Sequence, residues 1–253
     1  MQALRIQQDG ELLRVTLARP ERRNAFDATL IAELTQAFGA VGGDVRAVLL
    51  AGDGPSFCAG ADVEWQRASI DLTFDENVED ALRLHAMLAA LDSCPAPLVA
   101  RVQGYALGGG SGLVACADVV VAAPDATFGF SEVRLGIIPA VISPFVFARI
   151  GAGAARSLFV TGERFDAERA LRIGLVDEVA EDLDAAVERQ VAAILKSGPQ
   201  ATRAAKRLTR ERPSDPRDLA RIAAGLRAGD EGQEGLRAFL EKRDASWASK
   251  SSS

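Results

Sequence analysis

The sequence predicts an α/β fold with a largely parallel sheet. Several short runs are apolar and β-prone, as buried strands of a parallel sheet are. Runs with helical periodicity lie between them, and alternation of this kind is typical of a parallel sheet covered by helices. Beyond residue 198 no strand-like run remains, and only helical patterns follow. We therefore expect a core over residues 1–198 and a helical region over 199–253.

The N-terminal elements are the most clearly marked. Residues 4–18 alternate in polarity around Asp9-Gly10, which predicts a β-hairpin. Asp27 is suited to cap a helix that runs to about Phe38. Further strands are expected at 47–51, 98–102, 119–122 and 175–179.

The remaining helices follow from apolar periodicity and from Gly and Pro breaks. The segment 64–74 fits neither pattern, and 126–130 is a short strand or a turn. Helices are expected at 79–91, 111–117, 143–150, 154–161, 166–174, 184–196, 219–227 and 234–243.

Composition excludes several classes of protein. With 48% hydrophobic and 25% charged residues in 253, the chain is an ordinary globular protein. Its net charge of -6 favours neither nucleic acid nor an anionic membrane as partner. Three widely spaced cysteines (Cys58, Cys94 and Cys116) suit reduced thiols better than disulfides or a zinc site. With no signal pattern and no bilayer-spanning run, we expect a cytoplasmic protein.

The central feature of the sequence is Gly108–Gly110, between an apolar run and a helix. Glycine lets the backbone approach a ligand closely, and the first amides of a helix lack intrahelical partners. Such amides suit an anionic oxygen or an oxygen that becomes anionic. Glu132 follows in an otherwise apolar segment, where burial raises the pKa of a carboxyl group. Together, the amides of the glycine loop and the carboxyl group of Glu132 predict a site of proton transfer.

Three segments together resemble the enoyl-CoA hydratase/isomerase (crotonase) family. They are Phe57-Cys-Ala-Gly-Ala-Asp62, Gly104-Tyr-Ala-Leu-Gly-Gly-Gly110 and Phe128-Gly-Phe-Ser-Glu-Val-Arg-Leu-Gly-Ile-Ile-Pro139. The resemblance covers nearly the whole chain. It implies a spiral of ββα repeats with a C-terminal helical trimerisation region, assembled as a homo-trimer or as a hexamer of two trimers. It also implies an acyl-CoA thioester substrate and no metal or other cofactor, because CoA is part of the substrate.

The same resemblance implies roles for individual residues. The backbone amides of Ala61 and Gly109 would form an oxyanion hole, and Glu132 would transfer the proton. Contacts to the substrate are implied for Arg22, Ala25, Ala59, Asp62, Val63, Gly108 and Lys242.

One position departs from the family pattern. Hydratases with two glutamates carry one where this chain has Gly112. Two activities are therefore compatible with the sequence. One is a hydratase that works with a single carboxylate, and the other is a Δ3,Δ2-enoyl-CoA isomerase, which needs only one carboxylate. The sequence after Ile138 favours the hydratase, because it looks like bacterial hydratases of branched, carboxylated enoyl-CoAs such as 3-methylglutaconyl-CoA. We expect a lyase of fatty acid metabolism or branched-chain amino acid degradation.

Other functions are less well supported. A non-catalytic, RNA-binding protein of the same fold could use the basic cluster at 203–212, but an acidic chain without interleaved aromatics favours a solvated helix face there. Dehalogenase chemistry would need a nucleophilic aspartate where Ala140 stands. His85 and Cys58 are expected to be packing residues.

Overall fold

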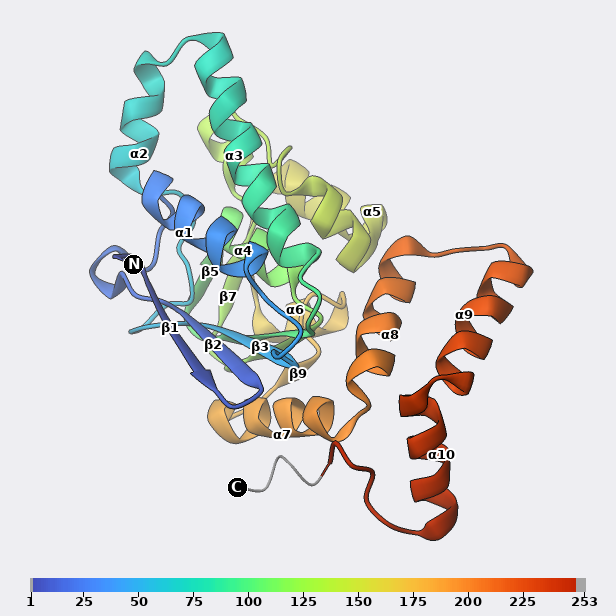
Figure 1. The fold of residues 1–253 in the computed structure, drawn as a ribbon. Helices are drawn as coiled ribbons and strands as arrows, with labels where there is room; N and C mark the ends of the chain where they lie inside the picture. The colour runs from blue at the N-terminus through green and yellow to red at the C-terminus, as the bar shows by residue number, and fades with distance from the viewer. Residues whose placement is uncertain (1, 249–253) are drawn as a thin grey trace.

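The computed structural model describes residues 2–248, so the last five residues of the predicted C-terminal region lie outside it. Two sheets form the core: a six-stranded sheet of order β1-β2-β3-β4-β6-β9 and a three-stranded sheet of order β5-β7-β8 (Figure 1). The strands are β1 Leu4–Asp9, β2 Leu12–Leu17, β3 Ala47–Gly52, β4 Leu98–Val102, β5 Tyr105–Leu107, β6 Val119–Ala122, β7 Thr127–Gly129, β8 Arg164–Asp166 and β9 Glu178–Val179.

Helices cover both faces of the large sheet. The α-helices are α1 Ala28–Gly39, α2 Val63–Ala68, α3 Phe74–Asp92, α4 Gly109–Cys116, α5 Ser143–Thr161, α6 Ala167–Arg172, α7 Leu183–Lys196, α8 Pro199–Glu211, α9 Pro216–Ala228 and α10 Asp230–Glu241. Short 3-10 helices are η1 Pro20–Arg22, η2 Ser69–Asp71 and η3 Glu132–Leu135.

The central strands are buried on both sides because their alternate side chains meet different helices. Val48 and Leu50 of β3 belong to the main core, which includes side chains of α1, α3 and α4. Leu49, on the opposite face, packs in a second cluster with Leu183 and Val187 of α7. This explains why β3 is apolar without alternation, as the sequence predicted for a buried parallel strand.

The chain builds the core by repeating one unit: a strand of the large sheet, a short strand of the small sheet and a helix. β4, β5 and α4 form one such unit, and β4 pairs in parallel with β3 and β6. Gly104 makes the bend from β4 to β5, with φ of 56°. A Cβ atom at Gly104 would collide with the carbonyl oxygen of Pro55, so this bend requires glycine.

Several boundaries differ from the sequence-based expectations. β5 and β8 were not predicted, because three residues are too few to show a period of two. The strand expected at 175–179 shrinks to Glu178–Val179. The segment 64–74, which fitted neither pattern, contains most of α2. α3 begins at Phe74, earlier than predicted, because Thr73 and Glu76 form a capping box. α4 begins at Gly109, whereas the sequence predicted a start at residue 111.

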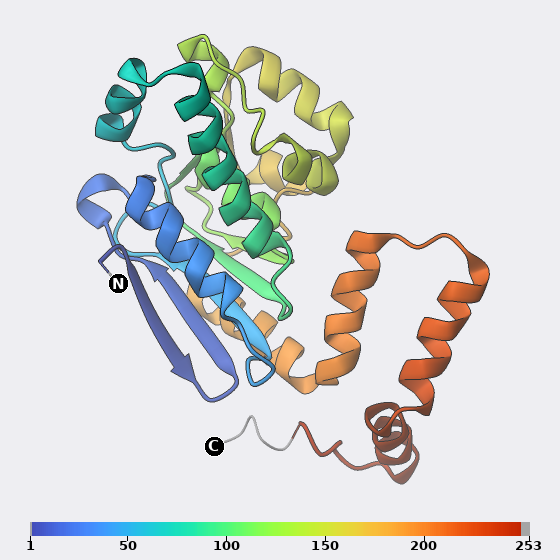
Figure 2. The same cartoon turned by 45° about the horizontal axis from the view of Figure 1, so that its top comes forward.

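The last three helices lie at one side of the core. α8 runs beside it, and α9 and α10 stand further out (Figures 1 and 2). α9 has no buried residue, while Phe239 and Leu240 of α10 are 80% and 76% exposed. Within residues 2–248, none of the helices has the length and apolar character that a bilayer crossing requires.

The expectation of a solvated basic face on α8 is wrong for three of its residues. Lys206 is only 7% exposed, and its ammonium lies 2.6 Å from a carboxylate oxygen of Asp118 and donates to the carbonyl of Ala96. Arg203 donates to carbonyls of the loop before β3, and Arg210 pairs with a carboxylate of α3. These cations attach α8 to the core, which the sequence could not indicate because their partners are distant along the chain.

Replacing Lys206 tests this attachment. Lys206→Met leaves Asp118 without its ammonium partner, and breaking a buried pair costs about 3 kcal/mol or more. We expect a loss of that order in the free energy of unfolding, measured by chemical denaturation. Arg207→Met is the matched control, because Arg207 is exposed on the same helix. Equal stability of the two variants would contradict the role of Lys206.

Candidate active site

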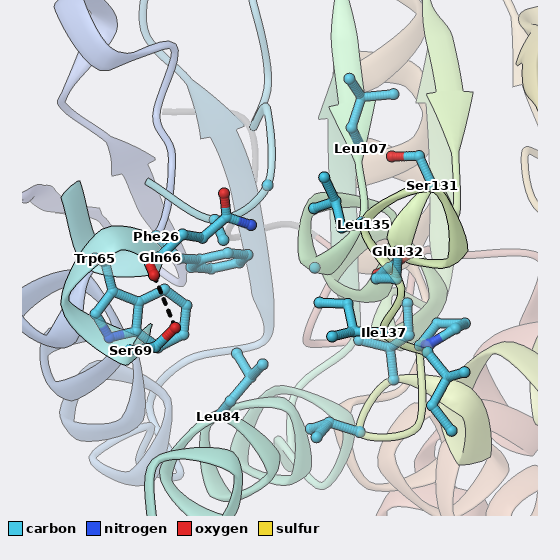
Figure 3. Close-up of a pocket in the computed structure, with 18 of the residues that line it drawn as sticks. Phe26, Trp65, Gln66, Ser69, Leu84, Leu107, Ser131, Glu132, Leu135 and Ile137 are labelled. Carbon is cyan, nitrogen blue, oxygen red and sulfur yellow. Dashed lines mark hydrogen bonds between the residues drawn. The ribbon is translucent and has the colours of Figure 1, made fainter. Parts of the chain in front are cut away.

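A cavity of about 440 Å³ lies among α2, α3, η3 and the loops that follow β3 and β5. Figure 3 shows Trp65 and Ser69 across the cavity from Glu132 and Ile137. Leu84 of α3 enters between these walls (Figure 3). The cavity is thus built by segments that are far apart in the sequence.

Backbone pairing joins the two loops that the sequence singled out. The N–H of Cys58 donates to Tyr105 at 2.9 Å, and the N–H of Leu107 donates back to Cys58 at 3.0 Å. The two loops approach so closely that a Cβ atom at Gly110 would overlap the carbonyl oxygen of Cys58. Gly110 is therefore needed for this contact rather than for a turn.

The pairing brings Ala61 and Gly109 to the same cavity. Within the described residues, neither backbone N–H donates to another group. Gly109 is the first residue of α4, so its amide has no partner inside the helix and lies at the positive end of the helix dipole. The ring of Phe26 packs against Gly109, where a Cβ atom would lie 2.7 Å from Cε2 of Phe26. Two unpaired amides beside one cavity can bind an oxygen that gains negative charge.

Glu132 opens η3 and lines the cavity. Its Oε1 would lie 3.2 Å from a Cβ atom placed on Gly108, and its Oε2 is buried without a hydrogen-bond partner among the described residues. Burial raises the pKa of Glu132, although its own backbone N–H acts in the opposite sense. This agrees with the raised pKa expected from sequence. A carboxyl group with a raised pKa and one unpaired oxygen is suited to accept and return a proton.

Gly112 faces Ile142 rather than open space. A Cβ atom at Gly112 would lie 2.7 Å from Cγ2 of Ile142 and 3.6 Å from Cδ2 of Leu88. Ile142 is itself 2% exposed. The place of the second family glutamate is therefore filled by an apolar side chain of another segment.

The other residues expected to contact substrate divide into two groups. Ala59 and Gly108 line the cavity, whereas Arg22, Ala25, Asp62, Val63 and Lys242 do not.

The residues outside the cavity have their own surroundings. Asp62 is 5% exposed, caps α2 and pairs with Arg19 at 3.3 Å, so its carboxylate has a structural role. Arg22 and Val63 are exposed, Ala25 is buried, and Lys242 follows the last residue of α10. Contacts between these residues and a bound nucleotide remain a prediction.

Of the two residues expected to be packing residues, Cys58 agrees with the structure and His85 does not. Cys58 is fully buried, and burial raises the pKa of its thiol to about 12, so it is not a thiolate at neutral pH. His85, expected to be a packing residue, is instead exposed on α3; it does not line the cavity, and its ring lies 5.5 Å from that of Phe145.

The sequence placed the pocket walls in two segments, 64–79 and 139–150, and residues of both line the cavity, among them Trp65 and Ile142. Sequence reasoning missed Phe26, Asp80 and Leu84. For Asp80 and Leu84 the available signal was the apolar periodicity of α3, which does not tell a residue facing the core from one facing a cavity.

Comparison with known proteins identifies the family that this fold and site define. Residues 7–250 match the family model of enoyl-CoA hydratase/isomerase. A cyclohexa-1,5-dienecarbonyl-CoA hydratase of Thauera aromatica is 36% identical, with 96% of this chain and 95% of the relative aligned. The chain therefore belongs to the enoyl-CoA hydratase/isomerase family.

Solved structures agree with the sequence matches. AtuE of Pseudomonas aeruginosa superposes with a TM-score of 0.93 at 37% identity, covering 97% of this chain and 99% of the other. An enoyl-CoA hydratase of Shewanella pealeana gives a TM-score of 0.89 at 37% identity, covering 97% and 96%. The fold is thus the crotonase spiral with its C-terminal helical region.

The contact between Gly112 and Ile142 predicts a coupled pair of substitutions. Gly112→Ala adds a methyl group where Ile142 lies, and overpacking of this kind costs about 1–3 kcal/mol. In an Ile142→Ala background the added methyl group has room, so its cost should fall. A double-mutant cycle of unfolding free energies measures the coupling. Independent effects of the two substitutions would contradict the packing described.

The raised pKa of Glu132 predicts how stability depends on pH. The folded protein binds this proton more tightly than the unfolded chain, so Glu132 lowers stability as pH rises from its unfolded to its folded pKa. Glu132→Gln removes this titration. The variant should gain in melting temperature relative to the natural protein as pH rises from 4 to 8 (~4 is near the unfolded pKa of glutamate). A constant difference across this range would contradict an unpaired, buried carboxylate.

Proposed function

We propose that this protein is an enoyl-CoA hydratase that adds water to the double bond of an α,β-unsaturated acyl-CoA thioester. The observation that carries the proposal is the placement of Glu132, with its buried and unpaired oxygen, in the same cavity as the free amides of Ala61 and Gly109. Membership of the family supports the substrate class.

The two amides bind the thioester oxygen. As water adds to C3, electron density moves through C2 to this oxygen and gives an enolate. The N–H groups of Ala61 and Gly109 stabilise that charge, and a donor of this type contributes about 3 kcal/mol to the transition state. Backbone amides suffice for this role, which agrees with the small side chains at both positions.

Glu132 moves the proton. As a carboxylate it takes a proton from water while the water oxygen bonds to C3. The same proton is then delivered to C2 as the enolate collapses, and the carboxylate is restored. Atoms and charge balance with a single acid/base group, so a second glutamate is not required.

A Δ3,Δ2-enoyl-CoA isomerase is the second candidate, and Gly112 favours it. Ile142 fills the place of a second carboxylate, and isomerisation needs one group only. Glu132 would then take a proton from C2 and return it to C4, with the same enolate held by the same amides.

Several wider properties complete the proposal. The exposed Phe239 and Leu240 of α10 suit burial against other copies, in a homo-trimer or hexamer. Lys242 at the end of α10 would then lie near a neighbouring chain's substrate. We place the enzyme in the cytoplasm, in fatty acid or branched-chain acyl metabolism, without a metal or separate cofactor and without a nucleic-acid or membrane partner.

Product analysis separates the candidates. The protein is incubated with crotonyl-CoA and, separately, with a 3-enoyl-CoA. We expect 3-hydroxybutyryl-CoA from the first, and Glu132→Gln should lower kcat by at least about 100-fold, the usual contribution of acid/base catalysis. Glu64→Gln is the matched control, because Glu64 is exposed and outside the cavity.

The outcomes are distinct. Migration of the double bond without hydration would replace the hydratase by the isomerase. Turnover of neither substrate, or full activity of Glu132→Gln, would overturn the proposed mechanism.

A further inference from the structure

We propose that the acyl cavity selects chains with a hydrogen-bond donor, such as a hydroxyl group, and that Asp80 binds this group. The inference rests on the proposed function, because it assumes that the acyl part of a CoA thioester occupies the cavity. It differs from the branched, carboxylated chain that the sequence pattern suggested.

One face of α3 turns toward the cavity. Asn77, Asp80, Ala81 and Leu84 all line it, and their spacing places them on one side of the helix. Leu84 is apolar, whereas Asn77 and Asp80 lie toward the start of α3. The helix therefore presents a wall that changes from apolar to polar along its length.

This wall of the cavity has unused hydrogen-bonding capacity. The side chain of Asp80 is 16% exposed, and its Oδ1 accepts from Arg83 at 3.1 Å. Oδ2 has no partner among residues 2–248. The amide nitrogen of Asn77 is occupied by the carbonyls of Leu72 and Thr73, which leaves its oxygen as an acceptor. Both side chains thus offer acceptors, so they suit a donor on the ligand.

Another wall of the cavity contrasts with the polar part of α3, because it is apolar. Leu135, Ile137 and Ile138 line the cavity from η3 and the segment after it. Leu135 and Ile137 lie across from Ser69 of η2 in Figure 3. A chain that is apolar on one side and carries a hydroxyl group on the other would satisfy both walls in one orientation.

The charges of the cavity argue against a carboxylate on the α3 side. Glu132 and Asp80 line it, and Arg164 is the one cation among its described lining residues. The guanidinium of Arg164 lies 5.6 Å from the ring centre of Tyr105 on β5, while the cation next to Asp80 is Arg83, which is 60% exposed. A carboxylate directed at Asp80 would meet a like charge inside a cavity, where repulsion is stronger than in water.

Binding of unreactive ligands tests the inference apart from catalysis. Titration calorimetry compares three saturated thioesters: an alkanoyl-CoA, its ω-hydroxy derivative and its ω-carboxy derivative. Chains of six, eight and ten carbons scan the reach to Asp80. We expect the hydroxylated ligand of matching length to bind about ten-fold tighter than the alkyl ligand, as a hydrogen bond to a charged group provides. The carboxylated ligand should bind weakest.

Two substitutions separate the acceptor from the charge. Asp80→Leu should abolish the advantage of the hydroxylated ligand. Asp80→Asn keeps an acceptor but removes the charge, so it should retain only part of that advantage and bind the carboxylated ligand more tightly. Glu79→Gln is the matched control, since Glu79 is exposed on the same helix and outside the cavity.

Equal binding of hydroxylated and alkyl ligands at every length, or an unchanged preference in Asp80→Leu, would overturn the inference. Tighter binding of the carboxylated ligand to the natural protein would do so as well. None of these results affects hydration of crotonyl-CoA, so failure here is distinguishable from failure of the proposed function.

Discussion

The backbone pairing between Cys58 and β5 is the contact on which the candidate site depends. It joins a loop of the first half of the chain to the loop that opens α4, and so places Ala61 and Gly109 at one cavity. The pairing tolerates no side chain at Gly110. Small residues at these positions are therefore a condition for the approach of two backbones, and the free amides follow from that approach.

Glu132 keeps one oxygen, Oε2, buried without a partner. Burying an unpaired carboxylate oxygen is costly, and η3, which carries Glu132, packs against α5. Arg46 and Arg149 each leave a buried Nε without a partner as well, but Arg46 still pairs with Glu11 and donates to carbonyls at the end of α7 through its other guanidinium nitrogens. Among the described residues, Glu132 is the acidic side chain with a buried unpaired oxygen, and carboxyl groups with a perturbed pKa concentrate at functional sites.

In the proposed function, the cavity holds both the reacting groups and the acyl chain. One carboxyl group and two amides are enough for proton transfer through an enolate, whether water is added or a double bond moves. Ile142 fills the space beside Gly112 with an apolar side chain, while Asp80 and Asn77 add acceptors to the wall formed by α3. In the proposals made above, the first feature bears on the reaction and the second on the choice of acyl chain.

The sequence alone determined the α/β class, the N-terminal hairpin, the buried central strands and most helices, because these depend on local periodicity and capping. The family motifs also indicated Ala61, Gly109 and Glu132. Only the tertiary structure decided the short strands β5 and β8, the burial of Lys206 against Asp118, and the contact of Ile142 with Gly112. It also decided that Asp80 faces the cavity. Each of these depends on a partner far away in the chain, and local pattern carries no information about such partners.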